Sequence, residues 1–302
     1  MGWRHSEIVI DLLRLHQELS TLPTLEPNTH TNALFSRLVR LVIDSDDDQA
    51  AQRVLAEPEI HRIVPELRGL CSSAEVELER AWARRIVASH DPERELREFP
   101  YFTNYEQLTR MEHHGVLAVT GCGSRRRMLF VGAGPLPLTS LLFASQHGRT
   151  DIDNIDVDPE AVRLATRVAG ALRIRSLRFW CADVLTCTNL AHYDVVCLAA
   201  LVGAEPDLKS LVIKHLYQHM RPGALLLARS ARSLRALLYP PLDIGDLAGF
   251  RPLAVLNPYT EVINSLVVAE KPAAPGSPPA EAEELPVSRG LNLGAGRFND
   301  DL

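Results

Sequence analysis

The sequence predicts an α/β protein with a helical N-terminal domain over residues 1–118, a domain with a mostly parallel sheet over 119–271, and a disordered tail over 272–302. Three observations support this prediction. Apolar residues recur at helical spacing in the first 115 residues, and short apolar runs alternate with amphipathic stretches from about residue 125. After Lys271 the chain is rich in Pro, Ala and Glu and lacks the apolar residues that a folded core requires.

Leucine and isoleucine residues spaced by three or four positions predict the helices of the first domain. Ile8, Leu12, Leu15 and Leu19 line one face of the first helix. The same spacing predicts helices at 34–41, at 60–70, at about 73–89 as a separate fourth helix, and through 108–111.

Short apolar runs predict the strands of the second domain. Amphipathic stretches such as 159–171 and 207–220 separate them, and this alternation is typical of βαβ units in a parallel sheet. The predicted strands are 128–131, 152–157, 177–181, 194–201 and 224–228, with 252–256 and 262–269 closing the sheet.

Composition and charge argue against several classes of function. The net charge of −6 gives no basic footprint for nucleic acid or an anionic membrane, and no run approaches eighteen apolar residues. The N-terminus lacks the apolar region of a signal peptide, and the five cysteines form no C-x-x-C pair. Cys181 and Cys197 lie in apolar runs that predict buried strands. We therefore expect a cytoplasmic protein whose partners are small molecules, with its oligomeric state left open.

Glycines at the end of the first predicted strand indicate a ligand site. Gly132 and Gly134 allow the backbone to turn sharply and approach a ligand beneath a helix N-terminus. Position 137 is Pro where G-x-G-x-x-G has its third glycine, which argues against a dinucleotide pyrophosphate. A tight β–α turn without a ligand is the alternative.

Two aspartates follow the next predicted strands. Asp156 ends the second strand, where an acidic side chain typically accepts hydrogen bonds from ribose hydroxyls. Asp183 follows the third strand, where it can accept a hydrogen bond from an adenine amino group. Each aspartate alone is more often a cap or turn residue. Together with the glycine loop they favour a nucleoside pocket.

The glycine loop belongs to a string that is more specific than a general nucleotide motif. Residues 132–139, GAGPLPLT, resemble the G-x-G-P-L-P-L-T loop of nicotianamine synthases. The resemblance extends over about residues 6–270 and implies a helical domain on a Rossmann-like domain of the methyltransferase type. Its further blocks are 99–105, 156–159, 198–203, 229–231, 235–240 and 262–265.

The resemblance implies an enzyme that uses S-adenosylmethionine and moves its 3-amino-3-carboxypropyl (aminobutyrate) arm rather than its methyl group. Family members condense three S-adenosylmethionine molecules into nicotianamine, a metal chelator, and release methylthioadenosine at each step. Three alternatives remain open: a single transfer onto histidine or another amine in opine-type metallophore synthesis, a binding protein without turnover, and ordinary methyl transfer.

Transfer to an amine requires a proton acceptor, because the amine starts largely as ammonium and must lose a proton before it attacks. The resemblance places Glu79 at the reacting amine and Tyr105 in the lining of that site. An alignment shifted by one helical turn places Glu75 there instead, and Glu112 is a further carboxylate in the same region. Taken without the resemblance, Glu79 is a solvated helix residue and Tyr105 a core or interface residue.

The remaining site residues are assigned to S-adenosylmethionine. Arg229 and Arg235 are expected to bind α-carboxylates, because a guanidinium pairs with a carboxylate through two hydrogen bonds. The adjacent His113 and His114 point about 100° apart on a helix, so no metal site is expected. The complete cofactor-binding set is Gly132, Gly134, Pro135, Leu136, Thr139, Asp156, Asp183, Ala199, Arg229, Arg235 and Tyr239.

Overall fold

The structure is a computed structural model that describes residues 5–44, 48–121, 126–146, 150–203 and 206–273. The chain divides into two units, Met1–Pro272 and Ala273–Leu302, and the description below concerns the first. The predicted tail lies outside the described residues from residue 274 onward.

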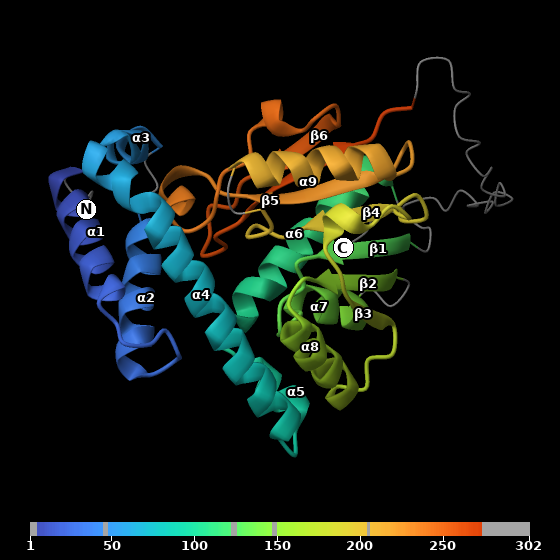
Figure 1. The fold of residues 1–302 in the computed structure, drawn as a ribbon, viewed down its shortest axis with the longest axis horizontal. Coiled ribbons are helices and arrows are strands. Elements are labelled where there is room, and N and C mark those ends of the chain that lie inside the picture. Colours follow the sequence, from blue (N-terminus) through green and yellow to red (C-terminus); the bar gives the residue numbers. More distant parts are fainter. Residues whose placement is uncertain (1–4, 45–47, 122–125, 147–149, 204–205, 274–302) are drawn as a thin grey trace, which may run out of the picture. The chain divides into compact units, whose positions relative to one another are not determined.

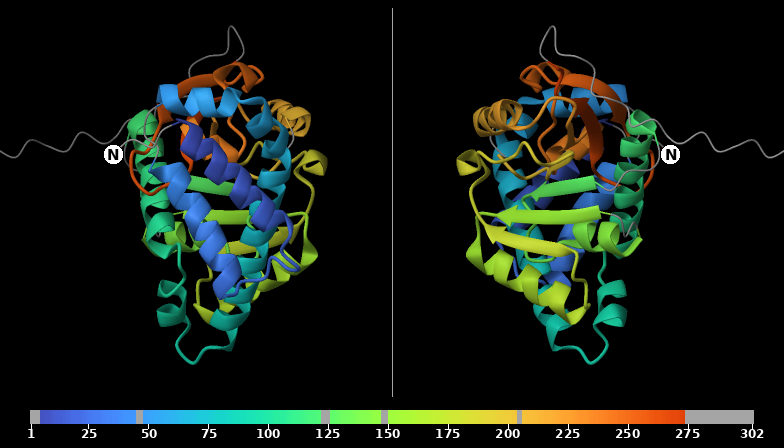
Figure 2. Two further views of the ribbon diagram at one scale, coloured as in Figure 1. Left: turned by 90° about the vertical axis from the view of Figure 1, so that its left-hand side faces the viewer. Right: turned by 90° about the vertical axis from the view of Figure 1, so that its right-hand side faces the viewer.

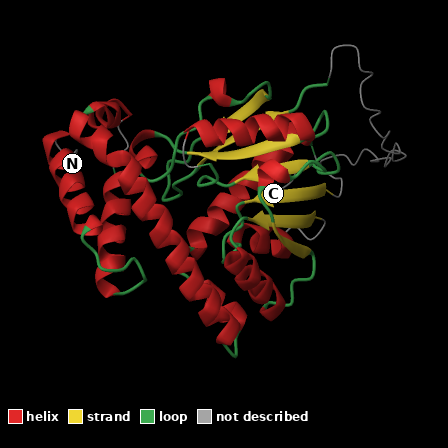
Figure 3. Cartoon of the chain, in the orientation of Figure 1, coloured by secondary structure: helices red, strands yellow, loops and turns green. Residues whose placement is uncertain are grey.

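The N-terminal part is helical, as the apolar spacing predicts (Figures 1 and 3). Asn28 caps the second helix, since its side chain accepts hydrogen bonds from the backbone N–H groups of His30 and Thr31. No helix in the described ranges is both long enough and apolar enough to cross a membrane. The helices are α1 (His5–Ser20), α2 (Thr29–Ile43), α3 (Asp48–Ala56), α4 (Pro58–Ala88), α5 (Pro92–Arg97) and α6 (Phe102–Thr120).

The two helices predicted at 60–70 and 73–89 are one helix of 31 residues, α4. Cys71 and Ser72 separate the predicted segments, and neither residue type interrupts a helix. Pro65 lies inside α4, so even proline does not divide it. The prediction of two helices is therefore wrong, and the correction matters because residues 72, 75, 76 and 79 share one continuous helix face.

The C-terminal part is a seven-stranded sheet in the order β3-β2-β1-β4-β5-β7-β6. Strands β1 to β5 are parallel, and β7 runs antiparallel between β5 and β6, which confirms the mostly parallel sheet. Its elements are β1 (Arg126–Val131), α7 (Leu138–Gln146), β2 (Thr150–Asp156), α8 (Pro159–Ala171), β3 (Leu177–Cys181), β4 (Val195–Leu198), α9 (Pro206–His219), β5 (Leu225–Ser230), β6 (Arg251–Leu256) and β7 (Ser265–Glu270).

Side chains of the central strand alternate between two apolar cores. Met128 and Phe130 of β1 pack with α6, α7, α8 and the C-terminal half of α4 on one face of the sheet. Leu129 and Val131 pack with α9 on the other face. This period of two is what a strand buried on both faces requires.

Cys181 differs from its prediction. The apolar run around it predicts a buried strand, but its side chain is exposed because β3 is the edge strand of the sheet. Cys197, on the central strand β4, is buried as predicted. Sequence composition does not distinguish an edge strand from a central strand when both runs are apolar.

A third apolar core joins the N-terminal helices to the segment after β5. That segment contains a short 3-10 helix, η2 (Ser233–Leu237), whose Leu234 and Leu237 pack with α1, α2, α3 and α4. Figure 2 shows α1 and α2 on one side of the molecule and the strands on the other. The contacts of η2 therefore connect the helices to the sheet.

We expect Leu234→Ala to lower the free energy of unfolding by about 2–5 kcal/mol, because it removes a fully buried side chain from this core. Denaturant unfolding of the purified protein measures the change. Leu253→Ala, on the partly exposed strand β6, is the matched control and should change the free energy by much less. Equal effects of the two substitutions would show that η2 does not anchor the helices.

Candidate active site

Two cavities meet where α4 passes the sheet. The first, of about 390 Å³, lies at the carboxyl ends of β1 and β4, where the order of the strands reverses. Ligands of open α/β sheets bind at this position. The second, of about 310 Å³, is lined by residues of α2, α4 and the segment 99–108.

Most of the predicted site residues line the first cavity. The structure therefore brings together side chains that lie as much as 160 positions apart in the sequence. Those that line it are Glu79, Tyr105, Gly132, Gly134, Leu136, Thr139, Asp156, Asp183, Ala199, Arg229 and Tyr239.

The loop after β1 requires its two glycines. Gly132 has φ +80° and Gly134 has φ +67°, a left-handed conformation that disfavours other residues. A Cβ atom at residue 132 would clash with Val202, and one at residue 134 would lie 2.5 Å from Oε2 of Glu79. The loop thus lies close to Val202 on one side and to Glu79 on the other. At the two glycines, only backbone faces the first cavity.

Asp156 shapes this loop in addition to lining the cavity. Its Oδ2 accepts a hydrogen bond from the Gly134 N–H at 2.9 Å, and its Oδ1 accepts one from the Asp158 N–H at 3.0 Å. Asp183 likewise caps the short helix after β3, since its Oδ1 accepts from the Leu185 N–H at 2.9 Å. Both aspartates therefore have the cap or turn role considered as the alternative, and both face the first cavity as well.

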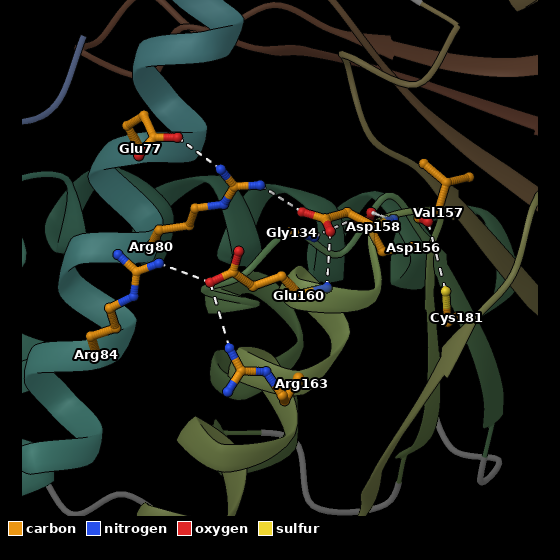
Figure 4. A network of polar contacts seen from close by, with 10 residues as sticks. All are labelled: Glu77, Arg80, Arg84, Gly134, Asp156, Val157, Asp158, Glu160, Arg163 and Cys181. Atoms are coloured by element: carbon orange, nitrogen blue, oxygen red, sulfur yellow. Dashed lines mark hydrogen bonds and ion pairs between the residues drawn. The ribbon is translucent and has the colours of Figure 1, made fainter. Parts of the chain in front are cut away.

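A chain of polar contacts connects α4 to this loop (Figure 4). Arg80 donates to Asp158 Oδ2 at 2.8 Å, and Asp158 caps α8 by accepting from the Glu160 N–H at 2.9 Å. Arg84 on the next turn of α4 donates to Glu160 at 2.8 Å. Since Asp158 in turn donates its N–H to Asp156, the contacts fix the helix that bears Glu79 against the ligand loop.

Glu79 is a buried carboxylate next to other negative charges. Burial raises its pKa well above the ordinary value, and the charges of Glu75 and Asp156 raise it further. A hydrogen bond from the Leu136 N–H and the charge of Arg229 act in the opposite direction. The result is a carboxylate that is a stronger base than a solvated glutamate.

Glu75 lies one turn before Glu79 and is bound by two tyrosines. Tyr239 donates to Oε2 at 2.8 Å and Tyr105 donates to Oε1 at 3.3 Å. Burial raises the pKa of Glu75, and these two hydrogen bonds oppose the rise. Burial and the charge of Glu75 also raise the pKa of both tyrosines, so both are neutral donors. Of the two glutamates, Glu79 is the one whose carboxylate lies against the glycine loop.

Arg229 lines the first cavity, but its charge is already matched. It donates from Nε to Glu112 Oε1 at 2.7 Å and from Nη2 to Glu112 Oε2 at 3.3 Å, and Nη2 also donates to Thr139 Oγ1 at 2.6 Å. Both members of the pair are buried. Glu112 is therefore the counter-ion of Arg229 and does not line the cavity.

Two residues of the predicted set lie elsewhere. Arg235 lies on η2, donates to the Thr260 carbonyl at 3.0 Å, and lines a separate cavity of about 20 Å³. Pro135 lines neither large cavity. Arg235 follows Arg229 by six residues, but the chain has left β5 before it reaches Arg235, and the side chain does not line the first cavity.

Some residues that line the site have no role predicted from the sequence, and Ser72, Val76 and Asn264 are among them. Ser72 and Val76 line the first cavity from the same face of α4 as Glu79, and a continuous helix would have indicated both. Asn264, just before β7, lines both cavities. Its place in a block resembling the family was the only signal.

The arrangement suits a nucleoside with an amino-acid arm. The glycine loop, Asp156 and Asp183 offer close backbone approach and carboxylate acceptors, while Glu75 and Glu79 offer negative charge for an ammonium group. S-adenosylmethionine has these parts, so the residues present fit it. No group of three or more His, Cys, Asp or Glu side chains placed to hold a metal occurs among the described residues.

Comparison with known proteins gives the family. The model of the nicotianamine synthase protein family matches residues 3–275. The chain belongs to the nicotianamine synthase family. A nicotianamine synthase of Solanum lycopersicum is 38% identical over 275 residues, which cover 90% of this chain and 86% of that protein. Nicotianamine synthase 1 of Arabidopsis thaliana is 35% identical over 285 residues, covering 92% and 88%.

Solved structures agree with the fold of this family member. A crystal structure of MtNAS in complex with MTA and tNA is 25% identical, has a TM-score of 0.77, and is matched over 88% of this chain and 97% of that one. A structure of MtNAS carrying a substitution, in complex with S-adenosylmethionine, is 24% identical with the same TM-score. The resemblance inferred from the GAGPLPLT loop is thus confirmed.

We expect Glu79→Gln to raise the thermal midpoint at about pH 8. A raised pKa means that the native state binds more protons than the unfolded state, so stability falls as the pH rises from about 4.3, the ordinary value, through the folded pKa of Glu79. Glutamine has no such ionisation, and the advantage of the variant should vanish near pH 4. Each kcal/mol corresponds to roughly 2–4 °C.

Thermal melts of both proteins across this pH range measure the difference. Glu59→Gln, the same substitution at an exposed position in the first turn of α4, is the control and should change the midpoint by much less at every pH. A lower midpoint for Glu79→Gln at about pH 8 would contradict the assigned shift.

Proposed function

We propose that this protein is a nicotianamine synthase of the cytoplasm that builds a metallophore, with Glu79 as proton acceptor. It transfers 3-amino-3-carboxypropyl groups from S-adenosylmethionine to an amine and releases methylthioadenosine. The observation that carries the proposal is the position of Glu79, a buried carboxylate on the boundary between the nucleoside cavity and the second cavity. In this proposal the helical segment 1–118 supplies the base, and 119–271 supplies the nucleoside cavity.

The reaction needs an acceptor amine in line with the carbon–sulfur bond that breaks, and a base within reach of the amine proton. S-adenosylmethionine supplies a sulfonium with activated carbons, and breaking the bond to the aminobutyrate arm leaves a neutral thioether. Displacement depends on in-line geometry, so the walls decide which carbon faces the amine. An acceptor amine in the second cavity reaches the boundary from the side opposite the nucleoside loop.

Glu79 performs two tasks in this scheme. Its charge, together with that of Glu75, attracts the acceptor ammonium to the boundary. Its raised pKa then lets it accept the proton that the ammonium must lose before the new C–N bond forms. Glu75 stays fixed by Tyr105 and Tyr239, which keeps the second charge at a defined place.

Incubation with S-adenosylmethionine alone, followed by mass spectrometry, tests the proposed reaction. We expect methylthioadenosine and nicotianamine to form without an added acceptor. A product that forms only after histidine is added would favour the single-transfer alternative. S-adenosylhomocysteine as the by-product would show methyl transfer and overturn the proposal.

Glu79→Gln should retain binding of S-adenosylmethionine and lose turnover by about 10²–10⁴-fold, the range typical for loss of a general base. Calorimetry measures binding, and methylthioadenosine release measures turnover. Glu66→Gln on the same helix should keep both. If Glu79→Gln turns over at the wild-type rate, Glu79 is not the proton acceptor.

A further inference from the structure

We propose that Asn264 binds the α-carboxylate of the acceptor amino acid at the boundary of the two cavities, an inference that rests on the proposed function. Five residues line both cavities: Glu75, Glu79, Tyr105, Tyr239 and Asn264. An acceptor amine that enters from the second cavity meets these side chains before it reaches the nucleoside cavity.

Asn264 has the unused donor of this boundary. It is only 8% exposed, and its Nδ2 has no hydrogen-bond partner among the described residues. A buried amide N–H without a partner costs free energy. The hydroxyls of Tyr105 and Tyr239, by contrast, already donate to Glu75. A ligand acceptor atom at Nδ2 would satisfy the one side-chain donor that the protein leaves open there.

The charge of the cavities points to a carboxylate as that acceptor atom. Among the described residues that line either cavity, Arg229 is the only cationic side chain, and Glu112 already binds it. The second cavity therefore offers two carboxylates for an ammonium group and no cation for a carboxylate. The carboxylate of an α-amino acid must then be bound by neutral donors, and Asn264 is buried at the place where one is needed.

Another asparagine of the second cavity is already engaged. Asn104 donates its Nδ2 to the Glu261 carbonyl at 2.6 Å. Asn264 is also held by the fold, because the next residue, Ser265, begins β7 and pairs with Ser230 of β5. The backbone of Asn264 is thus held on one side by the strand that follows it.

The assignment defines the substrate class. An ammonium on the Glu75 and Glu79 side and a carboxylate on the Asn264 side together select an α-amino acid, including the amino-acid end of a second S-adenosylmethionine molecule. A simple amine gains only the first of these contacts. Hydrogen bonds to charged groups contribute about 1.5–3 kcal/mol, which corresponds to roughly 10–100-fold in affinity.

Binding measurements on Asn264→Ala and Asn264→Asp test the inference. Calorimetry with nicotianamine, which carries carboxylates, should give a dissociation constant raised roughly 10-fold for Ala and more for Asp, since Asp adds repulsion. Methylthioadenosine has no amino-acid part, so its dissociation constant should change less than about twofold in both variants, which also reports an intact nucleoside cavity. Asn189→Asp, on an exposed loop, is the matched control and should bind both ligands as the wild type does.

The order of the two variants separates binding from structure. If Asn264 only supports the fold, the isosteric Asp variant should be milder than Ala, and methylthioadenosine binding should weaken together with nicotianamine binding; either result overturns the inference. Unchanged nicotianamine binding in both variants also overturns the inference. If the wild type still makes nicotianamine in that case, the proposed function stands. A wild type that makes no nicotianamine from S-adenosylmethionine overturns the proposed function and this inference together.

Discussion

The contact between the Glu79 carboxylate and the turn at Gly134 is the constraint on which the site depends. A Cβ atom at residue 134 would lie 2.5 Å from Oε2 of Glu79, so the helix and the loop approach this closely only because the loop carries glycine. The same approach removes the carboxylate from water and gives it the Leu136 N–H as a partner. One contact therefore sets both where the Glu79 carboxylate lies and how basic it is.

Holding that contact requires a rigid connection between the helices and the sheet. The apolar cores supply the stability, because partly exposed ion pairs such as Arg80 with Asp158 contribute only about 0–1 kcal/mol each. The ion pairs instead orient α4. They join it to the N-terminus of α8, and through Asp158 to Asp156, which shapes the loop. Because α4 is one continuous helix, the part that packs with α1–α3 and the part that lines the cavity keep a fixed orientation.

Local sequence patterns predict the elements, and topology then explains why distant residues converge. The carboxyl ends of parallel strands lie at one edge of a sheet, so the alternation of strands and helices is enough to group the loop at 132–134 with Asp156 and Asp183. The partners of buried charges do not follow from such patterns. Arg229 and Arg235 lie in similar sequence surroundings. The end of β5 places Arg229 beside Glu112 and the first cavity, whereas η2 places Arg235 beside Thr260. The exposure of Cys181 depends likewise on strand order, which residue composition does not encode.

The charges at the boundary between the two cavities determine how a ligand is held there. The boundary between them carries two carboxylates, and the Arg229–Glu112 pair behind it adds no net charge, so an arriving ammonium is attracted strongly. In the proposed reaction Glu79 accepts a proton, and one of the two negative charges is then lost. A ligand whose carboxylate is bound by the neutral Asn264 amide is then held far less tightly than one bound by a free guanidinium would be. Weak binding of the carboxylate favours release of the larger product after an amino acid has reacted in the site.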